Sequence, residues 1–189
     1  MEVQGDFDPD LTIQSERLVE VADYWRMIRG ARNMPSRDDV DPLQMPRHLL
    51  PHLELIDIER QPKFRLRWRL IGTHVTTAVA RDATGKYFDE IYTGEDFATI
   101  SGPFEWVAAN AMPLRWYGTS AFVGKEWLAY EGVYLPLSSD DKTVDRILGA
   151  VQYVLRQHIT PLPSAATGEN RFPIMDGLDP GHSPAMAFC

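Results

Sequence analysis

The stretch Phe64-Arg65-Leu66-Arg67-Trp68-Arg69-Leu70-Ile71-Gly72 decides the fold of this chain. Apolar residues alternate with three arginines along it, and this period of two predicts a strand with one buried face and one charged face. Gly72 and Thr73 end the strand, and a short helix is expected over 75–80. A turn is predicted at Thr84-Gly85, before more helix and three long strand-like runs. This order of elements predicts a small mixed α/β (α+β) domain built around a pocket.

Outward from this stretch, the pattern predicts an antiparallel sheet of five strands. The expected strands cover 53–59, 64–72, 114–123, 126–137 and 144–155. The last strands lack a clean polar face, so both faces of the sheet should be covered. We therefore expect short helices on one face of the sheet and an N-terminal helix on the other.

The N-terminal helix is predicted to run from the capping residue Ser15 to about Arg29, just before Gly30. Its apolar stripe is too wide for a helix lying alone in water. The helix should therefore dock on its own sheet or on a second copy of the chain, which would give a homodimer. We expect residues 1–14 to form a mobile arm, 15–155 the domain, and 156–189 a loosely structured tail rich in proline and glycine.

The composition argues against several kinds of partner. A net charge of −8 and a pI of about 5.1 disfavour nucleic acid, because the phosphate backbone is also negative. No run of residues approaches the roughly 20 apolar positions of a membrane span. The only cysteine is Cys189, which fits a reducing compartment. We therefore expect a cytoplasmic protein without a membrane or nucleic-acid partner.

No motif in the sequence predicts catalysis or metal binding. The chain has neither a His-Glu-x-x-His run nor a Gly-x-Ser-x-Gly run. His48 and His52 have the i, i+4 spacing of a metal-binding helix, but Pro51 between them should disrupt that turn. We therefore predict no catalytic residue, no metal site and no enzyme activity.

Several short motifs follow one another along the chain. They are Tyr24-Trp25, Met34-Pro35-Ser36-Arg37, Asp41-Pro42, Leu49-Leu50-Pro51, Arg69-Leu70-Ile71-Gly72-Thr73, Leu135-Pro136-Leu137 and Val144-Asp145-Arg146-Ile147-Leu148-Gly149. Together they resemble a PAS-like domain family that is abundant in alphaproteobacteria. The resemblance implies a sensory module that binds a small molecule or a partner protein and often dimerises through flanking helices. No kinase, cyclase or DNA-binding segment follows, so we expect the output to pass to a separate signalling protein.

The residues expected around the pocket are mostly aromatic. The candidate ligand-binding set is Trp68, Leu70, His74, Tyr87, Phe88, Phe104, Trp116 and Tyr134. Aromatic walls with a few polar groups suit a small organic ligand, although the same rings would also pack a solid core. His74 follows the second strand, where it could ligate haem, titrate, or simply cap a helix at the surface. The sequence names neither the ligand nor a cofactor.

Two other functions fit the same sequence. One is a protein-interaction scaffold with a filled core, and the absence of a cavity would favour it. The other is a small cone-shaped isomerase-type enzyme that uses a pocket tyrosine and a carboxylate, because a curved sheet over helices serves such enzymes too. A strongly raised carboxylate pKa beside a tyrosine would favour the enzyme, whereas a cavity without titrating groups would favour the sensor.

Overall fold

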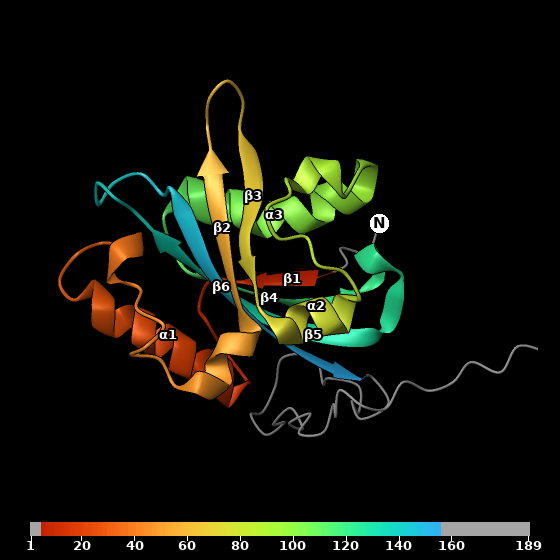
Figure 1. Ribbon diagram of the computed structural model, residues 1–189, viewed down its shortest axis with the longest axis horizontal. Helices are drawn as coiled ribbons and strands as arrows, with labels where there is room; N and C mark the ends of the chain where they lie inside the picture. The colour runs from red at the N-terminus through yellow and green to blue at the C-terminus, as the bar shows by residue number, and fades with distance from the viewer. Residues whose placement is uncertain (1–4, 156–189) are drawn as a thin grey trace, which may run out of the picture.

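The structure is a computed structural model that describes residues 5–155 (Figure 1). Its centre is a six-stranded antiparallel sheet with the strand order β1-β4-β5-β6-β2-β3. The strands are β1 (Gly5–Asp8), β2 (Leu53–Glu59), β3 (Arg65–Ile71), β4 (Leu114–Ser120), β5 (Lys125–Leu137) and β6 (Arg146–Leu155). The predicted tail, 156–189, lies outside the described residues. The mixed α+β class of the chain is confirmed.

The predicted count of five strands was wrong. Strands β2 to β6 follow the five expected segments closely, but β1 adds a sixth at the edge of the sheet. It comes from the segment expected to be a mobile arm, and it pairs antiparallel with residues 115–118 of β4. Four residues of the pattern Gly-Asp-Phe-Asp are too few to reveal a period of two in the sequence. The strand forms because the edge of β4 offers unpaired backbone groups.

A buried charge network anchors this first strand and the chain that follows it. Glu131 of β5 is 1% exposed, and its carboxylate accepts hydrogen bonds from the backbone N–H groups of Gln14 and Ser15, both at 2.8 Å. Arg115 of β4 donates from Nε to Glu131 and from Nη1 to Asp8, the latter at 3.2 Å. These bonds fix the path of the chain from β1 into the first helix.

Three α-helices and four short 3₁₀ turns complete the described part of the chain. They are α1 (Glu16–Arg29), η1 (Arg37–Asp39), η2 (Arg47–His52), α2 (Thr73–Val79), η3 (Phe88–Glu90), α3 (Gly94–Asn110) and η4 (Ala121–Val123). The sequence predicts a break in α3 at Gly102-Pro103, but the helix runs through it. Ser101, Pro103 and Phe104 are all buried there, so packing outweighs the hydrogen bond that proline cannot donate.

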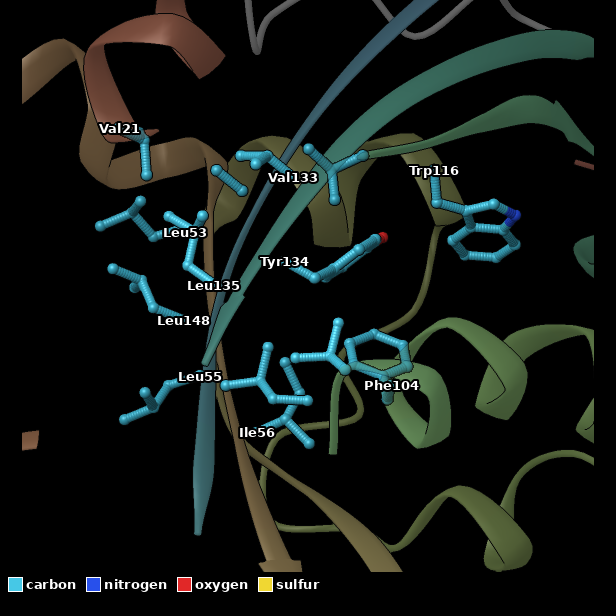
Figure 2. Close-up of a cluster of buried hydrophobic side chains, with 14 of the residues drawn as sticks. Val21, Leu53, Leu55, Ile56, Phe104, Trp116, Val133, Tyr134, Leu135 and Leu148 are labelled. Carbon is cyan, nitrogen blue, oxygen red and sulfur yellow. The ribbon is translucent and has the colours of Figure 1, made fainter. Parts of the chain in front are cut away.

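The helices cover opposite faces of the sheet (Figures 1 and 2). Helix α1 contacts β5 and β6, and Val21 points toward Leu135 and Leu148 on that face. The indole Nε1 of Trp25 donates to the Pro136 carbonyl at 2.9 Å and locks α1 against β5. On the opposite face, Phe104 of α3 packs edge-on against Tyr134 of β5. This second face holds the pocket.

Candidate functional site

A pocket opens between the sheet and the helices α2 and α3. Its floor comes from β2, β5 and β6, and its sides from β3, β4, α2, α3 and the loop after α2. The empty volume is about 530 Å³ when the open mouth is included. The pocket therefore lies on the face of the sheet that α1 does not cover.

Aromatic rings form most of the inner wall of the pocket. Phe104 meets Trp68 edge-on, with the ring centroids 5.9 Å apart, and meets Tyr134 at 4.6 Å. Trp116 lies 4.7 Å from Tyr130 and 6.1 Å from Tyr134. Edge-to-face contacts of this kind hold the rings in fixed orientations. The wall is thus a rigid aromatic surface.

Glu54 is the unexpected residue of the site. It lies on β2 between Leu53 and Leu55, is 3% exposed, and lines the pocket. Within residues 5–155, its carboxyl makes neither a hydrogen bond nor an ion pair. Burial raises the pKa of Glu54 to about 8, because a charged carboxylate is poorly solvated there. The group is therefore mostly a neutral acid at neutral pH.

Two glycines make room for the polar groups of the pocket floor. Gly149 of β6 pairs with Glu54, and a Cβ added to Gly149 would lie 3.3 Å from Glu54 Oε2. A Cβ on Gly132 of β5 would lie 2.7 Å from the Tyr134 hydroxyl. Only residues without a side chain leave space for both groups here.

Two further polar atoms of the pocket wall are buried without a partner. The Nε1 of Trp68 and the hydroxyl of Tyr130 have no hydrogen-bond partner in the described part of the chain. Burial, followed by the nearby Glu54, raises the pKa of Tyr134 and of Tyr153 well above 10. The tyrosines therefore stay protonated and able to donate.

The structure brings four of the eight predicted ligand-binding residues to the pocket. Trp68, Phe104, Trp116 and Tyr134 line it. Phe88 lies one layer deeper, stacked on Trp68 with the ring centroids 4.3 Å apart.

Leu70 and Tyr87 lie outside the pocket lining. Leu70 is 47% exposed, and it pairs with Leu55 beyond a bulge at Arg69 of β3, which breaks the strict alternation of that strand. Tyr87 lies near the surface, where its hydroxyl donates to Glu59 at 2.9 Å and Arg65 lies over its ring. These contacts with Glu59 and Arg65 hold the Tyr87 side chain near the surface, away from the pocket.

His74 belongs to a histidine pair beside the pocket. Its ring centroid lies 4.1 Å from that of His52, and its Nε2 accepts a hydrogen bond from the Tyr153 N–H at 3.2 Å. Burial, with a further contribution from His52, lowers the pKa of His74 to about 4. Burial also lowers the pKa of His52. Both rings are therefore neutral at neutral pH.

Sequence reasoning missed Glu54, Tyr130 and Tyr153. Glu54 stands among the apolar residues Leu53, Leu55 and Ile56 at the start of β2, and the neighbouring strand β6 is buried on both faces. A carboxylate in such a strand was a usable signal, because charged residues are almost never fully buried without a partner. The two tyrosines carried no such signal, since tyrosine is common in strands.

The comparison with known families agrees with this architecture. A family model described as a PAS domain matches residues 13–152. The chain belongs to the PAS domain family. This PAS match covers the segment from just before α1 to the middle of β6, and β1 lies ahead of it. No curated protein and no solved structure matches the chain. The predicted resemblance is thus confirmed.

Two further observations concern the described part of this PAS domain. Residues 5–155 contain no group of three or more His, Cys, Asp or Glu side chains that could hold a metal ion. None of the helices in that range is long and apolar enough to cross a membrane.

Proposed function

We propose that this PAS domain is a sensory or regulatory module that binds a small molecule in the pocket between the sheet and α2 and α3. The observation that carries the proposal is a set of three polar groups in the pocket wall: the buried carboxyl of Glu54, and the Trp68 Nε1 and Tyr130 hydroxyl groups, which have no hydrogen-bond partner among the described residues. Leaving a buried polar group unpaired costs about 1–3 kcal/mol. A ligand that pairs with these groups would recover that cost. Trp68, Phe104, Trp116 and Tyr134 would hold its apolar body, with no metal or other cofactor required.

The signal would leave the domain through its surface. The pocket mouth includes α2 and Arg81 in the loop after it, so a ligand would change the packing of both. We propose that a separate signalling protein in the cytoplasm reads this change, without membrane or nucleic acid. The outer side of α1, with Val19 and Met27 exposed, is the proposed contact for a homodimer.

Native mass spectrometry of the purified full chain tests the proposal. The mass would be compared with the denatured mass for the wild type, for Val79→Trp at the pocket wall, and for Thr77→Trp, an exposed control on the same helix. We expect a bound small molecule in the wild type and in Thr77→Trp, and its loss in Val79→Trp. A bare chain in all three, together with no thermal shift from any compound in a fragment collection, would instead support an interaction module.

One observation favours a second function, an isomerase-type enzyme. The pKa of Glu54 is raised to about 8 beside Tyr134 and Tyr153, as an acid–base pair acting on a carbonyl compound would need. Neither tyrosine hydrogen-bonds to Glu54, however, so no group among the described residues orients the carboxyl for proton transfer, and the sensor remains the first proposal. If the domain is such an enzyme, a bound carbonyl compound should exchange its α-hydrogen for deuterium in D₂O with the wild type and not with Glu54→Gln. Binding without exchange contradicts it.

A further inference from the structure

The unpaired carboxyl indicates the chemical class of the ligand, and this inference rests on the proposed function. We infer that the pocket takes an organic cation, an amine on a flat or aromatic body whose ammonium group lies against the carboxylate of Glu54. The apolar body would fill the space between the rings of Trp68, Phe104 and Trp116.

Charge is the first part of the argument. Glu54 is a buried acid, and burial is the sole cause of its pKa shift, so no cationic side chain of the described residues compensates it. Arg81 is the one Arg or Lys among the pocket-lining residues of that range, and it is exposed at the mouth, 5.9 Å from the ring of Tyr92. A buried carboxylate needs an opposite charge close by. The pocket lacks that charge, and a cationic ligand would supply it.

The surrounding rings are the second part of the argument. Tyr92, Tyr134 and Tyr153 all interact electrostatically with Glu54, so three rings lie near the carboxyl. The faces of aromatic rings are negative and attract cations, more strongly when water is excluded. An anion would instead meet the acid. The rings close to the carboxyl thus favour a positively charged ligand.

Two further polar atoms of the pocket wall set the other polar contacts of the ligand. Trp68 Nε1 can only donate a hydrogen bond, and neither it nor the Tyr130 hydroxyl has a partner among the described residues. A hydroxyl, ether or carbonyl oxygen on the ligand would accept a hydrogen bond from either atom. The inferred ligand is therefore an alkylammonium ion that carries an aromatic ring and an acceptor group, rather than an acid or a hydrocarbon.

Binding should release a proton from the protein. With a pKa of about 8, Glu54 is protonated near neutral pH in the free domain. An ammonium group beside it stabilises the ionised form, so the acid proton leaves to solvent while the amine keeps its own. Near pH 6, about one proton should leave per ligand bound, and the number should fall toward zero above pH 8.

Isothermal titration calorimetry on the full chain tests the inference with three compounds of one shape. They are 2-phenylethylamine, 2-phenylethanol and phenylacetate, titrated in buffers of different ionisation enthalpy to count protons. The variants are Glu54→Gln and, as a matched control on the same strand, Glu59→Gln outside the pocket. We expect the amine to bind about tenfold or more tightly than the alcohol, with phenylacetate weakest. Glu54→Gln should remove the preference and the proton release, and Glu59→Gln should keep both.

Other results overturn the inference. Equal binding of amine and alcohol, unchanged in Glu54→Gln, would mean that the pocket takes neutral ligands, and the proposed function would stand without the cation. Failure of all three compounds to bind wild type would also reject the cation site, and native mass spectrometry would decide separately whether the pocket holds any ligand. Glu54→Gln replaces one neutral group by another of the same shape, so the variant is expected to fold.

Discussion

Glu54, which lines the pocket, and His74, which lies beside it, make opposite contributions to stability as the pH changes. The pKa of Glu54 is raised to about 8 in the folded chain, so the native state holds its proton when the unfolded chain has lost it. The pKa of His74 is lowered to about 4, so as the pH falls the unfolded chain binds a proton on this histidine before the native state does. Above about pH 6.5 only the first effect changes with pH, and below it the two oppose each other.

Glu54→Gln should therefore flatten the pH dependence of stability above about pH 6.5, where the His74 effect no longer changes with pH. From about pH 4.5 to about pH 8, ionisation of Glu54 in the unfolded chain should reduce the free energy of unfolding of the wild type, by up to about 5 kcal/mol. Above that range the loss should stop, because both states are then ionised. Urea denaturation across this range measures it. An equal slope in wild type and Glu54→Gln would mean that the carboxyl is not buried as described.

His74 is best tested in the Glu54→Gln background, where the opposing effect is absent. Lowering the pH from about 6.5 toward 4 should reduce the free energy of unfolding, because the unfolded His74 becomes charged and the native ring does not. Since His74 is partly exposed to solvent, we expect a loss of about 1–2 kcal/mol from this residue. His74→Gln should make the decline in chemical denaturation curves shallower. An unchanged slope would assign the decline to His52 or other groups.

At the scale of elements, the join between β1, β5 and α1 depends on one buried charge network. Glu131 holds the backbone of Gln14 and Ser15 and the guanidinium of Arg115, which also reaches Asp8. A local sequence pattern could not reveal this network, because its bonded partners are more than 100 residues apart except for Arg115 and Glu131. Residues 5–8 of the predicted mobile arm form an edge strand instead.

Glu131→Gln should be one of the most destabilising single substitutions in the domain. It leaves Arg115 buried with a weaker partner, and breaking a buried ion pair costs about 3–5 kcal/mol. Denaturation midpoints measure the loss, and amide exchange at Gln14 and Ser15 should speed up first. Glu105→Gln, at an exposed position of α3, is the control, with an expected change within about 0.5 kcal/mol. Similar losses in both variants would contradict the anchoring role.

At the scale of the whole molecule, helices α1 and α3 lie on opposite sides of the sheet (Figure 1), and the pocket lies on the side of α3. The pocket is walled by α2, α3 and the loop that carries Arg81, whereas α1 packs on the opposite face through Trp25 and Val21. A ligand thus acts directly on one side of the domain. Any effect on α1 must pass through the packed side chains of the sheet.

A bound ligand should therefore stabilise the two sides unequally in hydrogen exchange. At a concentration of 2-phenylethylamine near 100 times its Kd, the free energy of unfolding should rise by about 2.7 kcal/mol. Amides that exchange through local opening should slow in α2 and around residues 81–92, and those in α1 should change little. If amide exchange slowed only in α1, the ligand would bind on the α1 face of the sheet, and the proposed pocket would be contradicted.

The sequence by itself determined the elements and the class of this protein. It predicted β2 at its observed bounds, the period of two predicted β3 to within one residue at each end, and the short motifs predicted the PAS family. It also predicted that aromatic residues such as Trp68 and Phe104 would gather on one side. These features are local, because they depend on which neighbours along the chain share a face.

Only the tertiary structure decided what meets on each face. It placed Glu54 opposite Gly149, brought His74 against His52, and turned Leu70 and Tyr87 away from the pocket. Such contacts depend on strand order, on register and on the bulge in β3, which bring together segments far apart in the chain. A strand pattern records that a side chain points inward, but the residues it meets there are chosen by how distant strands pair.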